Sequence, residues 1–251
     1  MTTPARIGLL GGTFDPPHIG HLVLARSAAI GLALDEVRLI PSGQPWQKSD
    51  AITPSRERLA MVEAAIKEFQ EQTDTGIARG NATSSPALDA QANGASDYSK
   101  SWHLMVDPRE VDRDGPTYTI DTLIALRAEL GPLVQLVWLM GADQLANLPT
   151  WHRWRELLEF AHLGVTSRGP AGLGNLPPPV VALLAEHGRD ALPELSGAEP
   201  SHAAGTITTF RMPPVPLSST ELRRQLRSGA RPTELVPKAV LELIDRNGLY
   251  R

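Results

Sequence analysis

The chain has 251 residues, of which 41% are apolar and 21% charged. This size and composition predict one large domain and exclude a fibrous or wholly disordered protein. The net charge of −4 gives no overall attraction for nucleic acid or an anionic membrane, and the absence of cysteine excludes disulfides, thiolate catalysis and Cys-ligated metals.

The first part of the chain predicts a strand, a helix and a second strand. Residues 7–10 are an apolar run that ends at Gly11-Gly12, as a buried central strand does. Residues 20–34 are rich in Ala and Leu and contain no proline, which favours a helix, and residues 36–40 form a second strand that Pro41 stops. Strand, helix and strand at this spacing are typical of a parallel sheet.

The same alternation continues along the chain. A helix opens near Thr53 or Ser55, either of which can cap it, and its apolar residues recur at steps of three and four; they are Leu59, Val62, Ile66 and Phe69. Further strands are expected at 104–106, 133–140, 164–166 and 207–212, and a further helix at 119–130. We therefore predict a single α/β domain over residues 1–251 with an open, mainly parallel sheet.

Two irregular stretches interrupt this pattern. Residues 73–101 are mostly small or polar and cannot bury enough surface to offset their ordering entropy, so we expect a disordered surface insertion there. Residues 169–200 are rich in Pro and Gly around one short helix at 180–187. We expect a loop excursion there and a C-terminal helical part over residues 218–251.

The sequence shows neither a membrane-spanning segment nor a secretory signal. The most apolar run, residues 133–140, is far shorter than the roughly 20 residues that cross a bilayer. The residues before the first strand lack the long apolar stretch of a secretory signal. We expect a cytoplasmic protein with no membrane partner.

A first motif, at residues 11–22, joins the first strand to the first helix. Its glycines permit close backbone approach to a ligand, and a helix N-terminus offers unpaired N–H groups to an anion. His18 and His21 lie on one face of the first helical turn, where both imidazoles can reach one phosphate. They could instead be a metal pair or incidental surface histidines, although a metal needs a third ligand and the spacing is not H-E-x-x-H. The segment matches neither G-x-G-x-x-G nor a Walker P-loop.

A second motif lies near the other end of the chain, at residues 217–223. Ser218 and Thr220 can cap a helix whose first turn presents Arg223 to an anion at that end. Taken alone, this is also an ordinary N-cap followed by a solvated basic helix.

The two motifs together resemble those of the nucleotidyltransferase superfamily. Residues 18–21, after Gly12, Thr13 and Phe14, resemble its [HT]-x-G-H signature, and residues 217–223 resemble I-S-S-T-x-[IV]-R, with Leu217 and Leu222 in place of the usual branched residues. The resemblance implies a doubly wound, Rossmann-like nucleotidyltransferase fold and places the first motif, Ser218, Thr220 and Arg223 at a nucleoside triphosphate, with His18 nearest the reacting phosphate.

Two further blocks narrow the resemblance to bacterial nicotinate-nucleotide adenylyltransferases. Residues 118–123 and 141–154 are similar to that family's [ST]-Y-T-x-D-T-L and G-x-D…L-x-x-W-x-x-W blocks. The resemblance implies that Gly141 and Asp143 contact ATP. It implies a mononucleotide site formed by Lys48, Tyr118, Thr119 and Trp151. Arg168, after the strand expected at 164–166, could also line this site and face the nicotinate carboxylate or a phosphate. Trp151 and Trp154 could instead share one packed helix face, the interpretation we favour for Trp154, and Lys48 alone would be an ordinary exposed lysine.

The implied reaction joins ATP and nicotinate mononucleotide to give nicotinate adenine dinucleotide and pyrophosphate. We expect Mg²⁺ to be bound through the ATP phosphates without a protein metal site, and a homo-oligomer is compatible with the sequence. The alternatives are a phosphopantetheine adenylyltransferase or cytidylyltransferase, a non-catalytic nucleotide-binding regulator, and an NAD-dependent dehydrogenase, which would need the missing glycine fingerprint.

Overall fold

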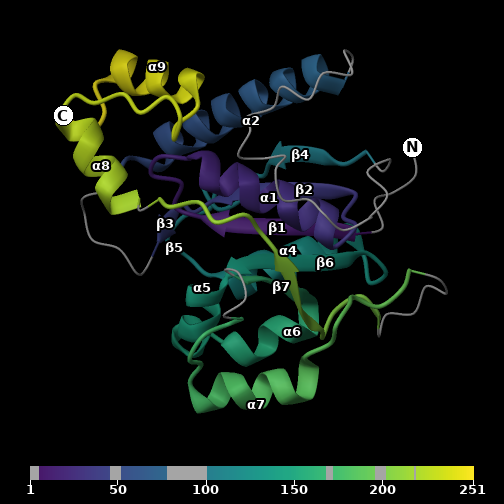
Figure 1. Ribbon diagram of the computed structural model, residues 1–251. Coiled ribbons are helices and arrows are strands. Elements are labelled where there is room, and N and C mark those ends of the chain that lie inside the picture. The colour runs from purple at the N-terminus through teal and green to yellow at the C-terminus, as the bar shows by residue number, and fades with distance from the viewer. Residues whose placement is uncertain (1–5, 46–51, 78–100, 168–171, 196–201, 218) are drawn as a thin grey trace.

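A computed structural model describes residues 6–45, 52–77, 101–167, 172–195, 202–217 and 219–251 (Figure 1). Its centre is a six-stranded sheet in the order β4-β2-β1-β6-β7-β8, and every neighbouring pair is parallel. The strands are β1 (Arg6–Gly12), β2 (Glu36–Pro41), β4 (His103–Val106), β6 (Gln135–Gly141), β7 (His162–Ser167) and β8 (Ile207–Arg211). From β1 the chain builds one side of the sheet and then crosses to build the other, so the predicted doubly wound, parallel α/β fold is confirmed.

Helices cover both faces of this sheet. They are α1 (Ile19–Gly31), α2 (Ser55–Ile77), α4 (Thr119–Leu130), α5 (Ala142–Asn147), α6 (Leu157–Phe160), α7 (Pro178–His187), α8 (Ser219–Arg227) and α9 (Lys238–Asn247), with short 3₁₀ turns at η1 (Leu148–Thr150) and η2 (Trp154–Glu156). The helices α8 and α9 lie beside α2, at the end of the molecule away from α6 and α7 (Figure 1). The described residues contain no helix long and apolar enough to cross a membrane.

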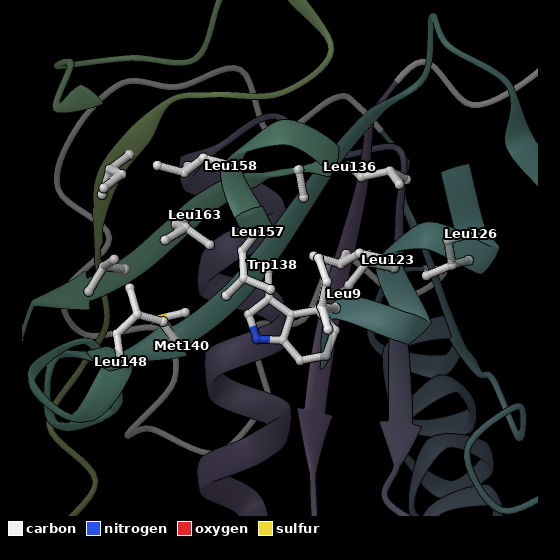
Figure 2. Close-up of a cluster of buried hydrophobic side chains, with 14 of the residues drawn as sticks. Leu9, Leu123, Leu126, Leu136, Trp138, Met140, Leu148, Leu157, Leu158 and Leu163 are labelled. Atoms are coloured by element: carbon white, nitrogen blue, oxygen red, sulfur yellow. The ribbon is translucent and has the colours of Figure 1, made fainter. Parts of the chain in front are cut away.

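The strand β6 shows why the sheet is buried on both faces. Successive side chains of a strand point to opposite faces. Leu136, Trp138 and Met140 therefore pack against α4 to α6 (Figure 2), whereas Val137 and Leu139 pack against α1 and α2. A third apolar cluster joins the other side of α2 to α8 and α9, which fixes the second motif's helix to the main domain.

Several details differ from the sequence expectations. The first helix ends at Gly31 rather than Leu34, because Ala33 has a left-handed backbone (φ 50°) and the Leu34 N–H turns back to the carbonyl of Ala29. The helix α2 continues to Ile77 and so includes the first residues of the 73–101 segment, of which residues 78–100 lie outside the described part. A small parallel pair, β3 (Gln44–Pro45) with β5 (Pro116–Thr117), was not expected.

His162, at the start of β7, is fully buried, and its two hydrogen bonds suit a neutral imidazole. Its Nδ1 accepts the Thr206 N–H at 3.1 Å, and its Nε2 lies 3.1 Å from the carbonyl of His202, to which it donates. Burial, with the nearby cations Arg6 and Arg127, lowers the pKa of His162 to about 4.

This burial makes stability depend on pH. The unfolded state takes up a proton near pH 6.5 but the folded state only near pH 4, so the free energy of unfolding falls as the pH falls through that window, by roughly 2 kcal/mol between pH 7 and 5 for His162. Urea unfolding at both pH values measures the loss, and His162→Asn is expected to remove this part of it. An unchanged pH dependence in the variant would contradict the assignment.

Candidate active site at the carboxyl edge of the sheet

The strands β1 and β6 are neighbours at the centre of the sheet, and the two loops that leave their carboxyl ends diverge. The chain after β1 leads to β2 on one side, and the chain after β6 leads to β7 on the other. In doubly wound sheets, ligands bind in the crevice above such a switch of direction. Gly12 ends β1 and Gly141 ends β6, so both predicted nucleotide-contacting loops open on this crevice.

His18 and His21 form a stacked pair at the start of α1. The ring centroids are 3.8 Å apart with an interplanar angle of 20°. The His18 N–H donates to Nδ1 of His21 at 3.2 Å, which caps the helix and uses Nδ1 as an acceptor. An imidazole that accepts at Nδ1 carries its N–H at Nε2 when it is neutral, so Nε2 is the donor nitrogen of this ring.

The imidazole of His18 is buried, and its surroundings fix what it can do. Its Nε2 lies 3.2 Å from Oγ of Ser219, whereas its buried Nδ1 has no hydrogen-bond partner within the described structure. Burial lowers the pKa of His18 to about 4, so the ring is neutral at pH 7. Gly20 leaves room for the ring, since a Cβ there would lie 3.1 Å from it.

The turn between β1 and α1 contributes Phe14, whose ring contacts His21. Phe14 adopts a left-handed backbone (φ 48°), is almost fully buried, and presents its ring edge-on to His21 at a centroid distance of 4.8 Å. Gly12 accommodates this ring, because a Cβ at Gly12 would lie 3.1 Å from it. The Phe14 side chain thus supports His21, while Gly12 and Thr13 are partly exposed at the crevice.

The helix α8 brings the second motif to the first. Nη1 of Arg223 donates to the Asp15 carbonyl at 3.1 Å, and Nη2 lies 3.4 Å from the Thr220 hydroxyl. Together with the Ser219–His18 contact, these bonds bring segments about two hundred residues apart in sequence to one place. Ser218 lies outside the described residues; Ser219, which motif reading left without a role, is the hydroxyl that reaches His18.

Sequence reasoning missed Arg58, which connects the site's loops. Its guanidinium is buried and donates to four backbone carbonyls: those of Thr13 at 2.7 Å, Ser42 at 2.6 Å, Gly43 at 2.9 Å and Thr53 at 2.8 Å. Burial lowers the pKa of Arg58, and the negative charges of Asp15 and Glu110 act in the opposite direction. The signal was present, because Arg58 lies one turn before Val62 on the apolar face of α2.

The residues expected to hold the mononucleotide form a second group. Tyr118 precedes α4, Thr119 is its first residue, and the Tyr118 ring lies 4.5 Å from that of His152, next to Trp151. Trp151 is half-buried against the core, and its buried Nε1 has no partner among the described residues. The β3–β5 pair connects this group to Gly43, because β5 ends at Thr117.

The two tryptophans do not share a helix face. The turn η1 ends at Thr150, and Arg153 is left-handed (φ 51°) before η2 begins at Trp154. Trp154 nevertheless packs against the core, with the Arg155 guanidinium carbon 4.3 Å from its ring centroid. The prediction that Trp154 packs against the core is therefore confirmed, but the prediction of one helix carrying both tryptophans is wrong.

Asp143 lies in the first turn of α5, directly after β6. It is exposed, and its Oδ1 lies 2.5 Å from the place where a Cβ on Gly141 would stand. Glycine at position 141 thus allows the carboxylate to sit over the strand end. The other two predicted contacts, Lys48 and Arg168, lie outside the described residues.

Comparisons with known proteins agree with this geometry. Residues 9–225 match the family described as cytidylyltransferase-like. A relative named "Probable nicotinate-nucleotide adenylyltransferase" from Pseudomonas syringae pv. tomato is 42% identical, over 100% of this chain and 96% of the relative. One with the same name from Aeromonas hydrophila is 41% identical, over 98% of this chain and 97% of the relative.

The chain belongs to the nicotinate-nucleotide adenylyltransferase family. Two solved structures share the fold of this chain. Plasmodium falciparum nicotinic acid mononucleotide adenylyltransferase complexed with NaAD has a TM-score of 0.63 at 16% identity, over 98% of this chain and 97% of that one. The same enzyme complexed with APC has a TM-score of 0.61 at 15% identity, over 98% and 97% of the two chains.

Proposed function

We propose that the chain transfers the adenylyl group of ATP to nicotinate mononucleotide, giving nicotinate adenine dinucleotide and pyrophosphate in NAD biosynthesis. The relatives' names support this reaction. The observation that carries it is the meeting of Ser219 and Arg223 of α8 with His18 and Asp15 at the carboxyl end of β1. That arrangement gathers donors for one triphosphate at the crevice of the sheet.

The reaction is an in-line exchange of phosphate bonds. A phosphate oxygen of the mononucleotide attacks the α-phosphorus of ATP, and the bond from that phosphorus to the oxygen bridging the β-phosphate breaks, which releases pyrophosphate. The attacking phosphate is already ionised at neutral pH, so no general base is needed. The protein's task is to position the two substrates and to stabilise the charge that moves to the leaving group.

The described side chains divide this task. The Nε2–H of His21 and the guanidinium of Arg223 donate to the ATP phosphates, and His18 supplies a neutral imidazole nearest the reacting phosphate. An approaching triphosphate favours protonation of His18, against the effect of burial. The remaining ATP contacts in this proposal are Gly12, Thr13, Phe14, Thr220, Gly141 and Asp143. Ser218 is included from the second sequence motif alone. The mononucleotide contacts are Lys48, Tyr118, Thr119, Trp151 and Arg168.

Mg²⁺ enters this proposal as a companion of ATP. The described residues offer no group of three or more His, Asp or Glu side chains that could hold a metal. We expect the ion to be held mainly by phosphate oxygens and water. When bound, the ion neutralises phosphate charge. Since both substrates are phosphorylated metabolites of the cell interior, we also place the activity in the cytoplasm.

A pyrophosphate-release assay tests the function directly. Purified protein with Mg²⁺, ATP and nicotinate mononucleotide is expected to release pyrophosphate and form the dinucleotide in equal amounts. CTP in place of ATP, or phosphopantetheine as acceptor, is expected to give no product, and nicotinamide mononucleotide in parallel measures the preference for the carboxylate. Binding of ATP without pyrophosphate release would contradict the proposal in favour of a regulator, and hydride transfer would indicate a dehydrogenase.

A further inference from the structure

Asp15 is an unexpected residue to find buried beside a triphosphate site. Its side chain is 6% exposed, and its negative charge opposes the binding of an anion at the same turn. A buried carboxylate is costly unless hydrogen bonds satisfy it. Its presence therefore needs an explanation other than contact with phosphate.

The hydrogen bonds of Asp15 supply that explanation. Tyr250 donates its hydroxyl to Oδ1, and the Thr53 N–H donates to Oδ2 at 3.4 Å. The backbone carbonyl of the same residue accepts Nη1 of Arg223 at 3.1 Å. Asp15 thus joins the segment after α9, the segment before α2 and the helix α8.

The backbone after α9 places the Tyr250 hydroxyl next to the Asp15 carboxylate. Gly248 ends α9 with a left-handed backbone (φ 65°), and Tyr250 is itself left-handed (φ 59°). The partly buried ring packs against the cluster that contains Leu222 and Leu226 of α8. Burial and the adjacent Asp15 carboxylate raise the pKa of Tyr250, so the phenol keeps its proton and remains a donor.

We propose that Tyr250 is a positioning residue for the triphosphate site, acting on Arg223 through Asp15. The phenol satisfies the buried carboxylate and thereby holds the turn whose carbonyl orients the guanidinium. Without the hydroxyl, the carboxylate loses a buried donor and moves toward water, and the carbonyl that holds Arg223 moves with it. The proposal rests on the assignment of Arg223 to the ATP phosphates.

Tyr250→Phe tests it, because the variant removes the hydroxyl and keeps the ring. We expect kcat/KM for ATP to fall about tenfold, the scale of one hydrogen bond to a charged group, and the Kd of Mg-ATP to rise, while KM for the mononucleotide stays within about twofold of wild type. Thr208→Val is the matched control. It removes the buried hydroxyl bond to the Asp190 carbonyl (3.2 Å) near the start of β8, and is expected to lower Tm without changing the ATP constants.

A double-mutant cycle with Arg223→Ala separates positioning from general destabilisation. If Tyr250 acts through Arg223, Tyr250→Phe has less than about a twofold further effect on ATP in the Arg223→Ala background. Additive effects, or a Tyr250→Phe enzyme with lower Tm and unchanged ATP constants, would overturn the proposal. Wild-type protein that binds no Mg-ATP or releases no pyrophosphate would instead refute the proposed function, so the two failures are distinguishable.

Discussion

His21→Ala is expected to lower kcat for adenylyl transfer by about 100-fold or more while the protein remains folded. The Nδ1 of His21 accepts the His18 N–H at 3.2 Å, so Nε2–H is the group that we propose as the donor to the phosphates. Losing one donor that acts at the transition state costs about this much. Steady-state kinetics with saturating substrates and circular dichroism of the same sample provide the measurement.

Two conservative variants separate the roles of the two ring nitrogens. His21→Asn keeps an acceptor near the position of Nδ1 and so preserves the helix cap, but it is too short to replace the donor, and its kcat is expected to be as low as that of His21→Ala. His21→Gln places an N–H near the position of Nε2 and is expected to recover part of the rate. The exposed His103 at the edge of the sheet serves as control, since His103→Ala should leave kcat unchanged. A His21→Ala enzyme with near-normal turnover would refute the assignment.

Arg58→Met is expected to cost about 3–5 kcal/mol in the free energy of unfolding. The side chain is 1% exposed, and its four carbonyl acceptors, with Asp15 and Glu110 nearby, would be left without their buried cation. Thermal unfolding is expected to show a Tm lower by roughly 6–20 °C. Activity should fall as well, even below Tm, since Thr13 and the Ser42–Gly43 segment both lose their anchor.

The control for this variant is Arg224→Met. The Arg224 side chain is 73% exposed and pairs with Glu221 in solvent, so its loss should leave Tm nearly unchanged. Equal Tm values for Arg58→Met and the wild type would show that the four carbonyls are satisfied in another way.

The sheet could be predicted because its signals are local and repeated. The central strands β1 and β6 carry apolar runs, and β6 is buried on both faces, so residues 136–140 are all apolar. The two-residue strands β3 and β5 give no such signal, because a pair so short has no periodicity. They form where Arg58 donates to the carbonyls of Ser42 and Gly43 and where Glu110 accepts the Thr122 hydroxyl, and these are contacts between distant parts of the chain.

The sequence predicted which motif residues belong to the candidate site, but not the hydrogen bonds that hold them in place. The motif residues His18, His21 and Arg223 follow from their pattern, and the structure brings their segments together. Their support does not follow from the pattern. Arg58 stands out as a charged residue on the apolar face of a helix, and Tyr250 lies far beyond the second motif, but neither pattern says what the side chain contacts. Only the folded chain shows that Arg58 and Tyr250 bond to the turn after β1.

The long-range contacts at Asp15 and His18 also bear on how the protein acquires activity. His18 meets Ser219 across 201 positions of sequence, and Asp15 meets Tyr250 across 235. Bringing such distant segments together is slow relative to forming local contacts. During refolding, recovery of turnover should therefore lag behind recovery of helical signal, and enzymatic assay would report the last event in assembly of the native state.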